Sequence, residues 1–287
     1  MAKPRQIAVN GVDVSDQIES NLKGRCAGKP AVTERCAGKT CLSQLHEIII
    51  LSSPLFIHHS CPQCNSLRFS LLTFCSNTNY TAGDAFSSNL DQLFFMLATK
   101  GQPTGFALGT VGYGQNKVNG LTLCRGDVKP AACGTCIRNS ATQLRDLCPL
   151  KKSAIVWFDD CLLRYSDLEF FGEIDNSDTF YMWNVQNVSD YSTFNNKVNE
   201  LLNEITLVAY VKPSLFATGE KEIKIGGTEE KLYGLVQCTR DLSGEDCKKC
   251  LDGAISQLPS CCDGKRGGRV IGGSCNFRYE LYSFYDV

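Results

Sequence analysis

The strongest constraint on this chain is a cysteine pattern that occurs twice with identical spacing. In each copy a cysteine is followed after eight residues by Cys-x-x-Cys and then by two more cysteines. The members are Cys124, Cys133, Cys136, Cys148 and Cys161, then Cys238, Cys247, Cys250, Cys262 and Cys275, each pair 114 residues apart. The same offset carries Gly120 to Gly234, Leu144 to Leu258 and Tyr165 to Tyr279. Self-similarity at a fixed period predicts two copies of one fold.

The number of cysteines indicates where the chain folds. Seventeen cysteines in 287 residues are far more than reducing compartments usually tolerate, so their regular spacing predicts disulfides made in the secretory pathway. Hydrophobic residues make up 43% of the chain, which is enough for packed cores. The formal net charge of −1 provides no basic surface for nucleic acid or anionic lipid.

Periodicity predicts the same elements in both copies. Apolar residues at helical spacing run from Phe86 to Leu97, with a stop at Lys100-Gly101, and their counterparts begin at Phe194, at an offset of 108. A second helix follows each Cys-x-x-Cys and carries Ile137, Ala141 and Leu144, or Leu251, Ile255 and Leu258. Extended runs at 154–158 and 161–165, and at 269–271 and 275–282, predict closing antiparallel pairs. Each copy is therefore expected to be α+β, an antiparallel β-sheet packed by two α-helices and stapled by disulfides.

These elements define the expected domains. The first copy covers residues 74–168 and the second 181–287, with an acidic, turn-rich linker at 169–180. Residues 1–66 do not fit the repeat and hold five further cysteines, an odd number. We expect this segment to be an atypical extension, either disordered or the product of a mistaken start or exon boundary. Its apolar run at 48–57 is too short to span a membrane.

Several kinds of chemistry are disfavoured by the residues present. All three histidines lie in the first 60 residues, so the repeats have no imidazole for general-base catalysis or zinc binding. The Cys-x-x-Cys motifs could instead be redox pairs, but each belongs to a longer cysteine pattern without a βαβ context. Zinc bound by both motifs would need ligands from two domains 114 residues apart. Structural disulfides are the favoured interpretation, and we expect no enzyme activity, metal or cofactor.

The duplicated pattern, with CCDGKRGGRV at 261–270 and CNFRYELYSFY at 275–285, resembles the plant stress-antifungal domain of ginkbilobin and the cysteine-rich repeat secretory proteins. The resemblance covers about residues 75–287. The same tandem forms the ectodomain of cysteine-rich receptor-like kinases and plasmodesmata-located proteins. Because the sequence contains neither a membrane span nor a kinase motif, it is similar to the secreted form, and we expect an extracellular, apoplastic protein.

The resemblance implies three disulfides in each copy. Carried over, the pairs are Cys75–Cys148, Cys124–Cys133 and Cys136–Cys161, then Cys238–Cys247 and Cys250–Cys275. Trp183 occupies the position of Cys75 in the second copy, so Cys262 lacks that partner. Its neighbour Cys261 is an additional cysteine, which leaves a vicinal bridge or two free thiols as alternatives.

The resemblance also implies a carbohydrate site. The ginkbilobin-type protein binds mannose through an asparagine, an arginine and a glutamate, which correspond here to Asn184, Arg269 and Glu280. The first copy has Ser76, Ile155 and Ser166 at these positions, so a sugar site is expected in the second copy alone. Tyr279 and Tyr282 could add an aromatic wall. The alternative interpretation is an Arg269–Glu280 salt bridge that closes the last hairpin, with Asn184 in a turn.

The function expected from these features is that of a secreted, lectin-like glycoprotein of plant stress, defence or antifungal response. Its partner would be a mannose-like carbohydrate or, in the alternative interpretation, a cell-surface receptor ectodomain bound by a protein-interaction module. Sequons at Asn79-Tyr-Thr and Asn187-Val-Ser predict N-glycosylation, as expected for a secreted chain.

Overall fold

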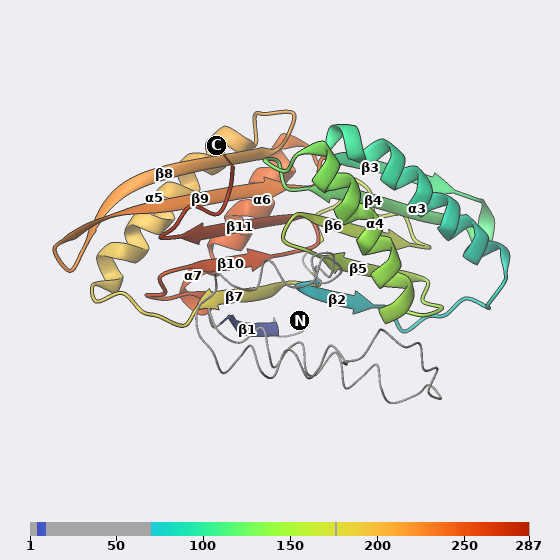
Figure 1. Ribbon diagram of the computed structural model, residues 1–287, viewed down its shortest axis with the longest axis horizontal. Helices are drawn as coiled ribbons and strands as arrows, with labels where there is room; N and C mark the ends of the chain where they lie inside the picture. Colours follow the sequence, from blue (N-terminus) through green and yellow to red (C-terminus); the bar gives the residue numbers. More distant parts are fainter. Residues whose placement is uncertain (1–4, 10–69, 176, 287) are drawn as a thin grey trace, which may run out of the picture. The chain divides into compact units, whose positions relative to one another are not determined.

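The computed structural model describes residues 5–9, 70–175 and 177–286 (Figure 1). Within the expected extension it describes Arg5–Val9, strand β1, which pairs in parallel with strand β7 of the second copy. The five cysteines of the extension, Cys26, Cys36, Cys41, Cys61 and Cys64, lie outside the described residues.

The first copy, repeat one, forms a five-stranded antiparallel sheet in the order β2-β5-β6-β4-β3. Its elements are β2 Leu72–Cys75, α3 Ala85–Thr104, β3 Phe106–Val111, a short 3₁₀ turn Gly114–Asn116, β4 Val118–Cys124, α4 Pro130–Leu147, β5 Ser153–Trp157 and β6 Cys161–Ser166.

The second copy, repeat two, has the corresponding strand order β7-β10-β11-β9-β8, with β1 added outside β7. Its elements are β7 Phe180–Asn184, α5 Tyr191–Ala209, β8 Phe216–Ile225, β9 Thr228–Cys238, α6 Gly244–Ile255, α7 Leu258–Cys261, β10 Gly268–Ile271 and β11 Cys275–Glu280. The predicted tandem α+β fold is therefore confirmed.

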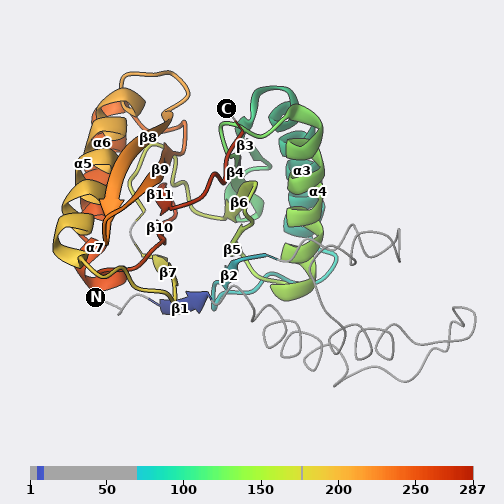
Figure 2. The same cartoon turned by 60° about the vertical axis from the view of Figure 1, so that its left-hand side comes forward.

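Figure 2 shows that the helices cover the outer side of each sheet and that the two sheets face each other. One core in each repeat lies between its helices and its sheet. A third core lies between the two sheets, because alternate residues of a strand point to opposite faces. Its buried members are Leu121, Leu123, Ile155, Trp157 and Leu162 of repeat one, Phe170 of the connecting segment, and Phe180 and Ile271 of repeat two.

The first helix of repeat one continues beyond the stop expected at Lys100-Gly101, so that prediction was wrong. Gly101 is buried inside α3, and a Cβ there would come within 2.9 Å of Ile137 and Thr122 side-chain atoms. This glycine allows close packing of helix α3 against its neighbours rather than ending it. The helix ends at Gly105, whose φ of 74° is the left-handed conformation favoured at a C-cap.

The second helix is continuous in repeat one and interrupted in repeat two. Helix α4 includes Ile137, Ala141 and Leu144, as expected. In repeat two α6 ends at Ile255, and Leu258 begins the separate helix α7, with Pro259 in its first turn. The expected uninterrupted helix through Leu258 was therefore wrong, because proline lacks the N–H of a helix interior and favours a first turn.

The segment expected to be a linker takes part in packing between the repeats. Phe170 is buried, and the Arg164 guanidinium lies 4.0 Å from the centre of its ring. Arg164 also forms a 2.9 Å ion pair with Asp175. Phe180, the last residue of the expected linker, is fully buried at the start of β7. The segment is thus held between the two repeats by contacts on both sides.

The structure joins six pairs of cysteines among the described residues. These are Cys75–Cys148, Cys124–Cys133, Cys136–Cys161, Cys238–Cys247, Cys250–Cys275 and the adjacent Cys261–Cys262. The first five are the pairs that the resemblance implies. In each Cys-x-x-Cys motif the two cysteines bond to different partners, so neither motif closes on itself.

Geometry explains why the Cys-x-x-Cys spacing suits disulfides to two different partners. Cys124 and Cys161 lie opposite each other on the neighbouring strands β4 and β6. Cys133 and Cys136 are one turn apart on α4, about 5–6 Å, which is close to the distance between paired strands. One helical turn therefore reaches two adjacent strands at once. Cys238 and Cys275 likewise lie opposite each other on the neighbouring strands β9 and β11 of repeat two.

The two repeats differ in their third crosslink, which gives a prediction. Cys75–Cys148 closes a loop of sequence separation 73, whereas Cys261–Cys262 joins neighbours. Chain-entropy arguments assign about 4 kcal/mol to the former and about 1 kcal/mol to the latter. The double variant C75S/C148S should therefore lose about 3 kcal/mol more unfolding free energy than its control C261S/C262S, measured by urea titration. Equal losses would contradict this assignment.

The core between the sheets gives a second prediction. Trp157 is buried there, packs edge-on against Phe180 at 5.3 Å, and donates its indole N–H to Gly272 O at 3.1 Å. Trp157→Ala should lower the unfolding free energy by about 3–5 kcal/mol, because it leaves a cavity and an unpaired carbonyl. Tyr113→Ala is the control, since Tyr113 is 89% exposed and should change stability by less than about 0.5 kcal/mol. Similar small effects of both changes in calorimetry would show that this core is not formed.

Candidate binding site

The three residues expected to bind sugar come together on one face of the sheet in repeat two. Asn184 ends β7, Arg269 lies in β10 and Glu280 ends β11. The backbone N–H of Asn184 donates to Gly267 O at 2.9 Å, and the register of β10 and β11 places Gly267 opposite Glu280. Asn184, Gly267 and Glu280 therefore form a row across three strands, and Arg269 follows two residues along on the same face. We call Asn184, Arg269 and Glu280 the polar strip.

Gly267 is needed in this row because the Glu280 side chain lies over it. A Cβ on Gly267 would overlap the Glu280 carboxylate. The glycine therefore leaves room for the carboxylate to fold back over the strand that separates it from Asn184. The opposite face of the same strands carries Tyr181, Val270 and Phe277, which belong to the core under the helices.

An aspartate of repeat one pairs with the arginine of the polar strip. Asp159 lies between β5 and β6, and its Oδ1 atom accepts a hydrogen bond from Arg269 Nη1 at 2.7 Å. Arg278, which lies opposite Arg269 on β11, is 4.0 Å from the same oxygen and donates from Nε to Glu280 Oε1 at 3.1 Å. The alternative expectation of a direct Arg269–Glu280 bridge is thus replaced by two ion pairs, Asp159–Arg269 and Arg278–Glu280.

Burial and charge shift the ionisation of the two carboxyl groups in opposite directions. Burial raises the pKa of Glu280 above its ordinary value, and the nearby Arg278 guanidinium only partly offsets this. At Asp159, desolvation alone would raise the pKa, but the Arg269 and Arg278 guanidinium groups outweigh it and lower the pKa. Asp159 is therefore the firmly ionised partner in this network.

Two polar groups of the strip have no partner among the described residues. The buried Nε of Arg269 has no hydrogen-bond acceptor there. Asn184 uses Oδ1 to accept from the backbone N–H of Gln186 at 2.8 Å, which places it in a turn as the alternative interpretation expected. Its Nδ2 group donates to no described residue. The amide donor of Asn184 thus remains for a ligand, whereas the Nε–H of Arg269 is enclosed by protein.

Of the two tyrosines expected as an aromatic wall, only one lies near the strip. Tyr279 is buried on the helix side of the sheet, where its hydroxyl donates to the backbone oxygens of Cys262 and Lys265. That part of the expectation was wrong, because successive residues of β11 point to opposite faces. Tyr282 is exposed, and its hydroxyl accepts from Arg278 Nη2 at 3.0 Å.

Repeat one has no equivalent polar strip. Ile155, its counterpart of Arg269, is buried in the core between the sheets. Ser76 and Ser166 replace the amide and the carboxylate, and their short side chains bond locally to Thr78 and Leu168. Sequence reasoning did not identify Asp159, because an acidic residue in a hairpin turn is common and carries no signal of a partner in another repeat.

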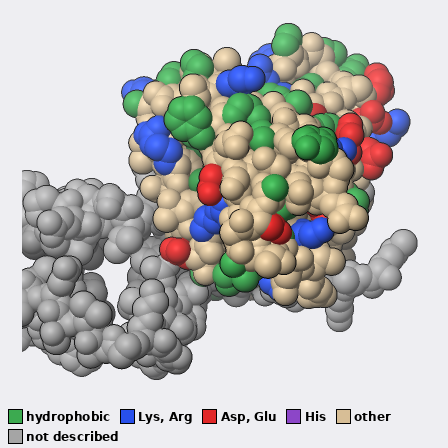
Figure 3. Space-filling view, turned by 90° about the vertical axis from the view of Figure 1, so that its right-hand side faces the viewer, with side chains coloured by type: hydrophobic (Ala, Val, Ile, Leu, Met, Phe, Trp, Pro, Cys, Tyr) green, Lys and Arg blue, Asp and Glu red, His purple; other side chains and the backbone are tan. Residues whose placement is uncertain are grey.

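The remaining candidate residues lie on the surface. Asn79 and Asn187, the expected glycosylation sites, are both exposed, and Lys265 Nζ donates to Asn187 Oδ1 at 2.8 Å. Within residues 70–175 and 177–286 no cluster of three or more His, Cys, Asp or Glu side chains could hold a metal. None of the described helices is long and apolar enough to span a bilayer. Figure 3 shows basic and acidic side chains interspersed on one face.

Comparison with known proteins agrees with this architecture. The profile of the family described as salt stress response/antifungal matches residues 74–168 and again 182–282. An antimicrobial ginkbilobin-2-like protein of Castanea crenata is 55% identical over 218 residues, which cover 76% of this chain and 89% of that protein. Cysteine-rich repeat secretory protein 38 of Arabidopsis thaliana is 50% identical over 234 residues, covering 80% and 91%.

Solved structures show the same tandem arrangement. The tandem DUF26 ectodomain of the Arabidopsis thaliana cysteine-rich receptor-like protein PDLP5 superposes with a TM-score of 0.61 at 27% identity, covering 74% of this chain and 99% of that one. The ectodomain of PDLP8 gives a TM-score of 0.62 at 25% identity, covering 75% and 100%. With two matched copies, the fold and these relatives, the chain belongs to the salt stress response/antifungal family of secreted cysteine-rich repeat proteins.

Proposed function

We propose that this protein is an extracellular, non-catalytic binding protein of the plant stress and antifungal response, and that it binds a mannose-type sugar at the polar strip of repeat two. The observation that carries the proposal is the convergence of Asn184, Arg269 and Glu280 on one sheet face. An amide, a guanidinium and a carboxylate together offer the donors and acceptors that adjacent sugar hydroxyls require. Two relatives, named as an antimicrobial protein and a secretory protein, support the stress and extracellular parts of the proposal.

The burial of the strip limits what it can bind. The side chains of Arg269 and Glu280 are 11% and 12% exposed, whereas Asp159 beside them is 57% exposed. A ligand must therefore approach from the more exposed side chains of the site, Asn184 and Tyr282. We expect a terminal sugar ring that presents its hydroxyls to Asn184 Nδ2 and to the small exposed part of the Arg269 side chain, and no long embedded chain.

The Asp159–Arg269 ion pair also favours a second candidate function, that of an extracellular protein-interaction module. In that case the strip serves to fix the two repeats against each other, and a protein partner binds another surface. The pair joins hairpin β5–β6 of repeat one to β10 of repeat two, so it is well placed for such a role. The two candidate functions predict different effects on mannose affinity when Arg269 or Asp159 is replaced.

Matched variants of this ion pair test the proposed sugar site. Arg269→Ala removes the donor that the sugar needs, and we expect at least a tenfold weaker affinity for mannose, or about 1.4 kcal/mol. Asp159→Asn breaks the same inter-repeat pair but keeps Arg269, so mannose affinity should stay within about twofold. Glycan-array binding followed by calorimetry with methyl mannoside gives both values. Absence of sugar binding by the unaltered protein, or equal loss in both variants, would favour the protein-interaction module.

The ion pair gives a separate prediction on pH. Because the folded protein lowers the pKa of Asp159, its contribution to stability is present above the ordinary carboxyl pKa of about 4 and is lost as pH falls through the folded-state value. Asp159→Asn should thus cost about 1–2 kcal/mol of unfolding free energy at neutral pH and progressively less on acidification.

The measurement is urea unfolding of both proteins from neutral pH down to about pH 3. Asp167→Asn is the matched control, because its 3.7 Å pair with Lys152 lies within repeat one and is partly exposed. It should cost less than about 0.5 kcal/mol at neutral pH. A stability difference for Asp159→Asn that does not shrink on acidification would contradict the assigned pairing.

A further inference from the structure

Repeat two contains a cavity that the polar strip does not use. It has a volume of about 580 Å³ and lies between α5 on one side and α6 and α7 on the other. This is within the size range of small-molecule sites. One wall is formed by side-chain amides of α5, and the other by charged and apolar residues of α6 and α7. The cavity opens on the helix side, away from the sheet face that carries the polar strip.

The amide wall is held in place by hydrogen bonds. Asn195, Asn199 and Asn203 follow one another at four-residue spacing, which puts them on one face of α5. Asn203 Nδ2 donates to Asn199 Oδ1 at 2.9 Å, and Asn195 Nδ2 donates to Asp263 Oδ1 at 2.6 Å. Asn195 Oδ1 in turn accepts from the backbone N–H of Gly264 at 3.1 Å. The amide groups of Asn195, Asn199 and Asn203 are therefore oriented before any ligand arrives.

Part of this wall is left for a ligand. Among the described residues, the Nδ2 group of Asn199 and the side chain of Asn196 have no hydrogen-bond partner, and both residues line the cavity. Each amide offers two donors and an acceptor. A ligand that both donates and accepts along one edge is the natural complement of these groups.

The opposite wall supplies a carboxylate and an apolar floor. Asp252 lines the cavity and pairs through Oδ2 with Lys248 Nζ at 2.6 Å, one helical turn away. The floor is formed by the buried side chains of Val198 and Ile255 together with Leu258. Polar groups along the rim and an apolar floor match a pyranose ring, whose hydroxyls lie at its edge and whose C–H groups form an apolar face.

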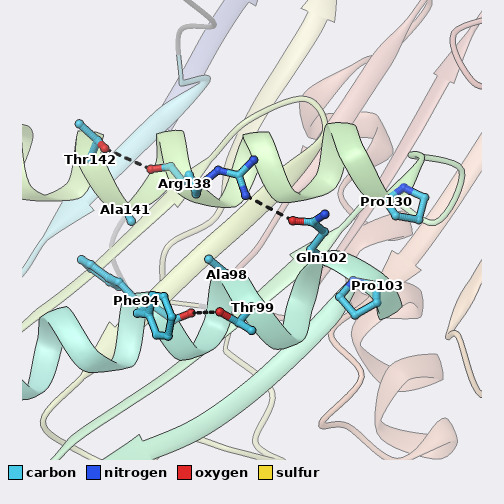
Figure 4. A pocket seen from close by; sticks show the side chains of 10 residues that line it. Phe94, Ala98, Thr99, Gln102, Pro103, Pro130, Arg138, Ala141 and Thr142 are labelled. Carbon is cyan, nitrogen blue, oxygen red and sulfur yellow. Dashed lines mark hydrogen bonds between the residues drawn. The ribbon is translucent and has the colours of Figure 1, made fainter.

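The corresponding groove of repeat one shows that the fold does not require this lining. That groove, between α3 and α4, has a volume of about 750 Å³ (Figure 4). At the offsets of the repeat, Phe95 replaces Asn203 and Arg138 replaces Asp252. Phe95 is 75% exposed, and Arg138 donates to Gln102 Oε1 at 3.3 Å across the groove. The two copies have thus kept the groove but changed its chemistry, from aromatic and cationic to amide-rich and acidic.

We propose that the cavity between α5 and α6–α7 is a carbohydrate site for one neutral or amino-substituted pyranose ring. The charged residues that line it are Asp252, Asp263 and Lys248, so carboxylates outnumber ammonium groups. This excess disfavours uronic acids and favours neutral or cationic sugars. The site lies on different elements from the polar strip and does not depend on it.

The test is calorimetric titration of the full chain with methyl glucoside, glucosamine and galacturonate as probes. We expect affinities in roughly the millimolar range for the first two and weaker binding of galacturonate. Asn199→Leu keeps the helix and the size of the side chain but removes the free amide. It should weaken glucosamine binding at least tenfold. Arg138→Leu, in the corresponding groove of repeat one, is the control and should leave the affinity unchanged.

The outcomes separate this site from the polar strip. Amide side-chain resonances of Asn196 and Asn199 should shift on titration, and Arg269→Ala should leave glucosamine binding intact. Loss of binding in Arg269→Ala with retention in Asn199→Leu would overturn the proposal and assign the sugar to the strip. Absence of binding of all three probes by the unaltered protein would overturn it without bearing on mannose binding at the strip.

Discussion

The crosslinks between the second helix and the sheet are the constraint on which the rest of this structure depends. In both repeats a Cys-x-x-Cys turn is bonded to two cysteines that face each other on neighbouring strands, and all four sulfurs lie in the core. The helix is thereby fixed in rotation and height over the sheet. Because one face of the sheet is occupied in this way, the opposite face is the surface left to meet the other repeat and ligands. The same bonds fix one of the two helices that border each groove.

Much of the fold could be predicted from the sequence, and the failures have physical reasons. Helical periodicity and the repeat offset located the long helices and the closing strands. The helix end predicted at Gly101 was wrong because a glycine at a close contact and a glycine at a C-cap look alike in a sequence. The helix predicted to continue through Leu258 was wrong because the apolar periodicity continues across the break before Pro259.

The candidate site was predictable only in part. Asn184, Arg269 and Glu280 were identified through a family resemblance, and strand alternation is enough to place them on one face. The pairing of Arg269 with Asp159 could not be predicted, because it depends on how the two sheets pack and joins residues 110 positions apart. The same reason explains why the connecting segment, acidic and turn-rich in sequence, contributes Phe170 to the core between the repeats.

Duplication has left two scaffolds whose functional surfaces have diverged. On the sheet face Ile155 packs where Arg269 carries charge, and in the groove Phe95 is exposed where Asn203 offers an amide. Repeat one thus contributes apolar surface for packing, whereas repeat two holds the polar groups suited to ligands. All of this rests on an oxidised framework. Mass-spectrometric mapping of the unreduced protein tests that framework most directly: we expect peptides that join Cys124 to Cys133 and Cys136 to Cys161, with the corresponding pairs in repeat two. Free thiols at these positions, or bonds within the Cys-x-x-Cys motifs, would contradict it.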